Sequence, residues 1–159
     1  MELEQSNVAK ATSNAGFLSR RVIALSGFIA AHLLLIWLGL HGVATPMGDI
    51  IYAYQPWVQR MQETGEFFGL QLPWVYPWPN LLLVFVPSQF HIDYQAAWLI
   101  WSTTFSVAAA SYLLWAKGFE SGKTARALWL WTATLFLLGP VSISRLDSFS
   151  VALSVVGVV

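Results

Sequence analysis

Long apolar runs separated by short polar segments dominate this chain. The three longest cover residues 22–44, 94–116 and 127–144. At about 1.5 Å of helical rise per residue, the first run exceeds the roughly 30 Å thickness of a bilayer's hydrocarbon core. The pattern predicts three full transmembrane helices over these ranges.

Polar segments flank the predicted spans. Residues 1–21 have mixed charge and no apolar core, which predicts a short tail. Gly139 and Pro140 should kink or unwind the third span near its outer end. Residues 145–159 form a polar turn followed by the start of a fourth, truncated span, so we expect either a longer chain or a covering partner.

The segment 45–93 is predicted to be one loop on the membrane surface. Its first half has apolar side chains every three to four residues, which indicates a surface-lying amphipathic helix within 50–68: Ile50, Tyr54, Trp57, Val58 and Met61. A later run, 81–86, lies between two prolines and is too short to cross. It predicts a half-inserted juxtamembrane element.

The positions of the cations give an orientation. Arg20 and Arg21 precede the first span, and Lys117, Lys123 and Arg126 follow the second. Because basic residues remain on the cytoplasmic side, the N-terminus and 117–126 are predicted to be cytoplasmic and 45–93 to be outside.

Composition supports this class and excludes others. The chain is 57% hydrophobic and 10% charged, against about 25% charged residues in a soluble domain. This predicts an all-α integral membrane protein. Zero net charge gives no basis for nucleic-acid binding. The absence of cysteine excludes disulfides and thiolate ligands, and His32 and His41 point to opposite helix faces, so neither a metal site nor a cofactor is predicted.

Three charged residues are predicted to meet on the outer face: Asp49, Arg145 and Asp147. A carboxylate at this depth can act as general base toward a sugar hydroxyl, or it can cap the helix that begins at Ile50. Arg145 has the planar fork that suits a phosphate. It could equally form a structural pair with either aspartate.

Tyrosine and tryptophan are concentrated in the same outer loop. Most other tryptophans lie near predicted span ends, where aromatic belts are expected. Four ring-bearing residues in the loop are candidates for substrate contact: Tyr52, Tyr54, Tyr76 and Trp78.

The order of these elements resembles the N-terminal part of GT-C membrane glycosyltransferases, in particular glycosyltransferase family 87. The resemblance rests on GDIIYAY around Asp49 and on VYPWPNLLLVFVP, which begins at Val75. It implies transfer of a mannose-type sugar from a polyprenyl-phosphate donor to a lipid or glycan acceptor outside a bacterial plasma membrane. It also implies that Asp49 is the catalytic residue and that no metal is needed.

Two departures limit what the resemblance carries over. Trp78 stands where a second consecutive proline is usual, and the chain reads GPVSISRLD where relatives have a Gly-Gln motif. The roles of Arg145 and Asp147 therefore rest on their chemistry alone. A second hypothesis stays open, in which the chain is a small non-catalytic membrane subunit packed in a larger complex with other membrane subunits.

Overall fold

The computed structural model describes residues 2–42, 46–116 and 121–158, and it is mostly helical. Those ranges contain no β-strand. The elements, in chain order, are α1 (Glu2–His41), η1 (Ile50–Tyr54), α2 (Gln55–Thr64), α3 (Pro79–Phe85), η2 (Val86–Gln89), α4 (Tyr94–Trp115), α5 (Ser121–Leu138), α6 (Val141–Ser144) and α7 (Asp147–Val158).

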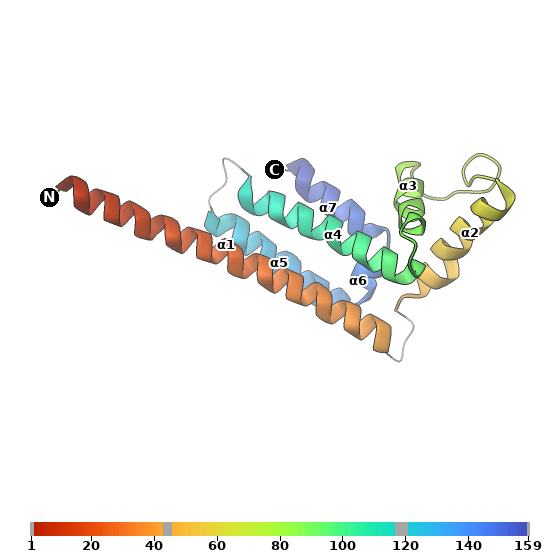
Figure 1. Ribbon diagram of the computed structural model, residues 1–159, viewed down its shortest axis with the longest axis horizontal. Helices are drawn as coiled ribbons and strands as arrows, with labels where there is room; N and C mark the ends of the chain where they lie inside the picture. The colour runs from red at the N-terminus through yellow and green to blue at the C-terminus, as the bar shows by residue number, and fades with distance from the viewer. Residues whose placement is uncertain (1, 43–45, 117–120, 159) are drawn as a thin grey trace.

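The helices α1, α4, α5 and α7 lie side by side as an elongated bundle (Figure 1). The most extensive contacts join α1 to α5 and α4 to α7. The chain runs along α1 toward one end of the bundle, passes through α2 and α3 there, and returns along α4. The loop predicted to lie outside is therefore gathered at a single end.

Two of the described helices are long and apolar enough to cross a bilayer, over Leu18–His41 and Tyr94–Trp115. They correspond to the first two predicted spans. The first begins earlier than predicted and its helix ends at His41, while residues 43–45 lie outside the described part of the chain. The third predicted span, 127–144, falls on α5 and α6 and is not one of these two candidate membrane helices. Helix α5 begins with polar residues and ends at Leu138, so its continuous apolar part is short.

The break in the third predicted span lies at the expected glycine-proline pair. Gly139 adopts a φ of 67°, in the left-handed region, and α6 begins at Val141 after Pro140. A left-handed residue ends an α-helix, and proline cannot continue the hydrogen-bond ladder. The kink predicted from the sequence is confirmed.

Replacing Gly139 with alanine should destabilise the fold by about 1–2 kcal/mol, because a Cβ is disfavoured at a left-handed residue. A new methyl group there meets no neighbouring atom within 4 Å, so backbone strain is the sole expected cost. Gly122→Ala is the matched control: the site is equally open, within α5, and alanine is the better helix former. Thermal unfolding in detergent should lower the midpoint for the first variant and not for the second. Equal shifts would contradict this account.

The predicted amphipathic helix is present, in two pieces. A turn of π-helix, η1, leads into α2, which ends at Thr64 and is followed by Gly65 with a φ of 71°. The predicted apolar face is present, since four of its side chains are almost fully buried: Ile50, Tyr54, Val58 and Met61. That face packs into the protein core, which corrects the expectation that it lies on the membrane surface.

Trp98 forms the centre of the core at the loop end of the bundle. It is 0% exposed, and its ring stacks on Tyr54 with 4.6 Å between centroids. Its Nε1 donates a hydrogen bond of 3.3 Å to the carbonyl oxygen of Ile143, and Phe149 packs edge-on against it. One side chain of α4 thereby joins η1 to α6 and α7.

Candidate functional site

Arg145 lies between the carboxylates of two aspartates. Asp49 is far from it in the sequence, and Asp147 is two residues after it. Nε of Arg145 is 3.1 Å from Oδ2 of Asp49 and 3.6 Å from Oδ2 of Asp147. The Arg145 and Asp49 side chains are 49% and 47% exposed, and that of Asp147 is 74% exposed. The three predicted charged residues therefore meet, and we call them the Arg145 cluster.

The backbone around Arg145 is tied to the first loop. Arg145 itself is extended and separates α6 from α7. On one side, Oγ of Ser144 donates to the carbonyl oxygen of Pro46 at 2.9 Å. On the other, the Leu146 N–H donates to the hydroxyl oxygen of Tyr54 at 3.2 Å. These two bonds hold the Arg145 turn beside the residues that flank Asp49.

Asp49 does not cap a helix, contrary to one of the two alternatives. It has helical backbone angles and its side chain makes no capping hydrogen bond to η1. The carboxylate points to Arg145 instead. The Arg145–Asp49 and Arg145–Asp147 pairs, foreseen as structural alternatives, are both present. Asp49 nevertheless retains the exposure that a proton acceptor for a hydroxyl needs.

Tyr54 is a buried residue that contacts the turn carrying Arg145 through the Leu146 backbone. It is 1% exposed, and burial raises the pKa of its hydroxyl well above the ordinary value, with nearby Tyr76 and Asp49 acting in the same direction. The Leu146 N–H opposes this shift by donating to the phenol oxygen. Tyr54 therefore stays neutral at physiological pH, and it acts as a packing and hydrogen-bonding residue.

Tyr54→Phe should destabilise the protein by about 1–3 kcal/mol, because it leaves the buried N–H of Leu146 without its acceptor. Tyr52→Phe is the control, since the Tyr52 side chain is exposed and its change should stay within about 0.5 kcal/mol. Denaturant unfolding in detergent followed by circular dichroism measures both. A Tyr54 variant as stable as the Tyr52 variant would show that the hydrogen bond contributes nothing.

The remaining candidate aromatic residues divide into two groups. Tyr76 belongs to an aromatic cluster whose other members are Trp57, Phe68 and Trp74. Trp57 also contacts Tyr54, so this cluster is continuous with the core beneath Asp49. Tyr52 and Trp78 are exposed. Trp78 lies against the turn at Gly69, where an added methyl group would be 3.3 Å from Nε1.

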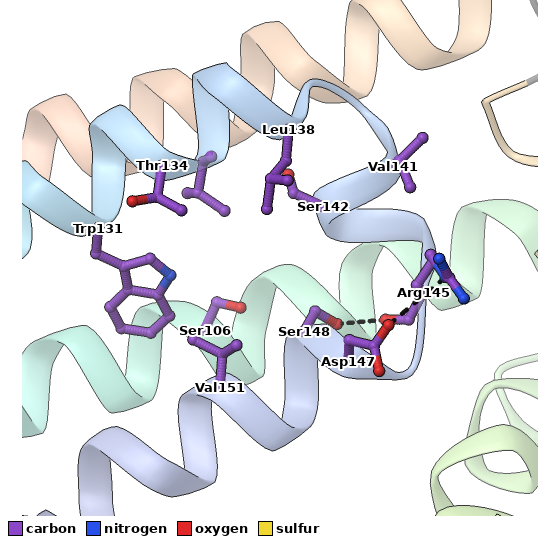
Figure 2. Close-up of a pocket in the computed structure, with 11 residues that line it drawn as sticks. Ser106, Trp131, Thr134, Leu138, Val141, Ser142, Arg145, Asp147, Ser148 and Val151 are labelled. Atoms are coloured by element: carbon purple, nitrogen blue, oxygen red, sulfur yellow. Dashed lines mark hydrogen bonds and ion pairs between the residues drawn. The ribbon is translucent and has the colours of Figure 1, made fainter.

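A cavity of about 180 Å³ opens beside the Arg145 cluster (Figure 2). Trp131, Thr134, Leu135 and Leu138 of α5 line one side, and Ser148 and Val151 of α7 line the other, with Ser106 of α4 between them. Arg145 and Asp147 lie at one end. The cavity is mostly apolar, and its two charged lining residues are at that end.

Sequence reasoning missed most of this cavity. Trp131 was expected to be an aromatic-belt or packing residue, yet it faces the cavity while packing on Phe28 at 4.9 Å. The small hydroxyl side chains gave one weak signal: Ser106, Ser142 and Ser148 lie in apolar surroundings, but α4, α6 and α7 contain other Ser or Thr residues that do not line the cavity. Ser142 and Ser148 donate to backbone carbonyl oxygens, which leaves hydroxyl oxygens available as acceptors.

The charges of the cluster define what it can bind. Two carboxylates and one guanidinium give it a net charge of −1 when all are ionised. A guanidinium has five N–H donors, so contacts at Nε leave donors for a further anion. In the described part of the chain, no three His, Asp or Glu side chains gather as a metal site would require.

Neither a protein-family model, nor a curated protein, nor a solved structure matches this chain. The resemblance to GT-C transferases therefore has no support from these comparisons, and the function must be argued from the site.

Proposed function

We propose that this chain is an integral membrane protein in which α1, α4 and the α5–α6 segment cross a bacterial plasma membrane, with the N-terminus cytoplasmic. The two long apolar helices support this. Arg20 of α1 and Arg126 of α5 also line one hollow at the end of the bundle opposite the Arg145 cluster. Cations gathered at one end are typical of the cytoplasmic side.

We propose further that the Arg145 cluster belongs to a GT-C-like glycosyltransferase, of which this chain supplies the N-terminal part. Its substrates would be a polyprenyl-phosphate-linked, mannose-type sugar and a lipid or glycan acceptor. One observation carries the proposal: Arg145, which pairs with Asp49, lies together with Asp147 at one end of a mostly apolar cavity of about 180 Å³. A cavity of this size accommodates the anionic end and the first few carbons of a molecule with a longer apolar chain.

The reaction needs one proton acceptor and one anion partner. Asp49 takes the proton from the acceptor hydroxyl as the hydroxyl oxygen bonds to the anomeric carbon of the sugar. The bond from that carbon to the phosphate oxygen breaks, and its electron pair leaves with polyprenyl phosphate. Arg145 binds this anion through donors not used by the aspartates. The leaving group is stable as an anion near neutral pH and needs no acid.

Arg145→Lys tests the anion partner. We expect the rate of sugar transfer to fall about tenfold or more, because lysine keeps the charge and loses the planar fork that binds phosphate at two points. The assay follows labelled mannose from polyprenyl-phosphate mannose into acceptors in membranes that contain the full-length native protein. Arg60→Lys is the control, since Arg60 forms an exposed ion pair with Glu66 at 3.6 Å. Equal rates for the two variants would contradict a role of Arg145 in donor binding.

A non-catalytic subunit is the second candidate. The observation that favours it is the direct pairing of Asp49 with Arg145, which by itself ties the first loop to the turn before α7. The native protein should then purify with stoichiometric membrane partners and transfer no sugar. Asp49→Asn would in that case reduce the recovery of the complex.

A further inference from the structure

The stretch between α2 and α4 is unusual because residues 67–92 contain no Asp, Glu, Lys or Arg, and His91 is their one titratable residue apart from tyrosine. It contains a turn at 67–72, where Gly69 donates to the carbonyl oxygen of Leu72, followed by α3 and η2. This segment also exposes several large apolar side chains: Phe67, Leu70, Val75, Trp78, Leu82 and Ile92. In water, such a surface would promote association.

These exposed residues are not the ones that hold the segment together. Leu81 and Val84 of α3 are buried against the protein, whereas Leu82, on the other side of the helix, is 67% exposed. Leu70 and Val75 in the loop are 69% and 83% exposed. The run 81–86, which was expected to be half-inserted, therefore packs part of its apolar surface against the protein. Much of the exposed apolar surface belongs to the loop that precedes α3.

The position of the segment relative to the bundle indicates what covers it. Figure 1 shows α3 crosswise to α4, at the end of the bundle where α1 ends and α4 begins. If α1 and α4 cross the bilayer, which rests on the proposal above, the segment extends along the bilayer surface and beyond the side of the bundle. Its C-terminal end then joins α4 at the lipid boundary, and its N-terminal end is connected to α1 through α2 and η1.

We propose that Leu70, Val75, Trp78 and Leu82 insert into the boundary between the headgroups and acyl chains of the outer leaflet. We call these four residues the loop surface. Tryptophan prefers this boundary, and aliphatic side chains gain from leaving water. None of these four side chains is ionisable, and residues 67–92 contain no Asp, Glu, Lys or Arg, so insertion of the loop surface desolvates no charged side chain of these types. The occupant of the loop surface is thus the lipid bilayer.

The absence of cysteine allows a direct test. Single cysteines are placed at Val75 and Leu70, labelled with the fluorophore NBD and reconstituted as full-length protein in phosphatidylcholine–phosphatidylglycerol liposomes. Quenching by a lipid with a doxyl group near the headgroup is compared with quenching by aqueous iodide. Glu63→Cys, exposed on α2, is the aqueous control. Leu34→Cys, exposed on α1 within the candidate span, is the membrane control.

We expect labels at 70 and 75 to be quenched by the doxyl lipid about threefold more than the label at 63, and to resist iodide. Iodide access equal to that at 63 overturns the inference. Protection from both quenchers also overturns it, because protein then covers the loop surface. If the label at 34 is not quenched by lipid either, the proposed spanning itself fails; if only 70 and 75 behave as aqueous sites, spanning stands and the loop inference falls.

Discussion

Asp49→Asn should lower the rate of sugar transfer by about 10²–10⁴-fold, the contribution usual for a positioned general base. Asparagine has nearly the same shape as aspartate and still accepts a hydrogen bond from Arg145, but it cannot take the proton of the acceptor hydroxyl. The pair with Arg145 at 3.1 Å loses its charge attraction and keeps its geometry. The measurement is mannose transfer from polyprenyl-phosphate mannose in membranes that contain the full-length native protein.

Asp147→Asn is the matched control for this prediction. Asp147 contacts the same nitrogen of Arg145 at 3.6 Å and is 74% exposed, so the change removes a weaker, solvent-screened pair. Transfer should fall at most about fivefold, which corresponds to the contribution of an exposed ion pair. If both variants lose activity equally, the cluster acts through its charge balance and Asp49 is not the base. If the Asp49 variant remains active, the transferase proposal is wrong.

Trp98→Ala should have the largest effect on stability, at about 3–5 kcal/mol, because truncating a fully buried aromatic ring leaves a cavity in the core. The ring is 0% exposed and contacts Tyr54, Tyr94 and Phe149. Its loss also removes the hydrogen bond to the Ile143 carbonyl oxygen. Denaturant unfolding in detergent, followed by circular dichroism, gives the free energy difference.

Trp115→Ala provides the comparison on the same helix. Trp115 is the last residue of α4 and is 44% exposed, so close to half of its surface already lies outside the core. We expect a cost of less than about 1 kcal/mol in detergent. Similar losses for the two variants would mean that Trp98 does not organise the loop end of the bundle, and the account of how the Arg145 cluster is positioned would need revision.

The sequence predicted a structural feature well wherever a single local property, such as side-chain burial or backbone conformation, determines that feature. Apolar residues every three to four positions identified the buried face of η1 and α2, because that face is the part of a helix that can leave water. Gly139 and Pro140 located the end of α5, because glycine readily adopts the left-handed conformation that ends a helix and proline cannot continue the hydrogen-bond ladder. Charge placement also predicted that Asp49 and Arg145 would lie on one face, and the structure pairs them.

Tertiary packing produced what the sequence could not show. The alternative in which Asp49 caps a helix was wrong, because the guanidinium of Arg145 pairs with the carboxylate and periodicity does not identify partners that are distant in the sequence. In the sequence, Trp131 also lies in an apolar run, and nothing distinguishes it from the tryptophans expected at span ends. The position of Trp131 beside the cavity depends on how α5 and α7 pack against α4. That packing is a property of the folded bundle and cannot be read from the sequence.

The hydrogen bonds that join Tyr54 to Leu146 and Ser144 to Pro46 link positions 92 and 98 residues apart. A ribosome releases these partners at different times, so Asp49 emerges with most of the chain still to be made. Until the turn at Arg145 has been synthesised and has reached the same side, the carboxylate has no guanidinium beside it. The site thus assembles only after residue 145 has been made, and a nascent chain stalled before that residue has Asp49 without its Arg145 partner.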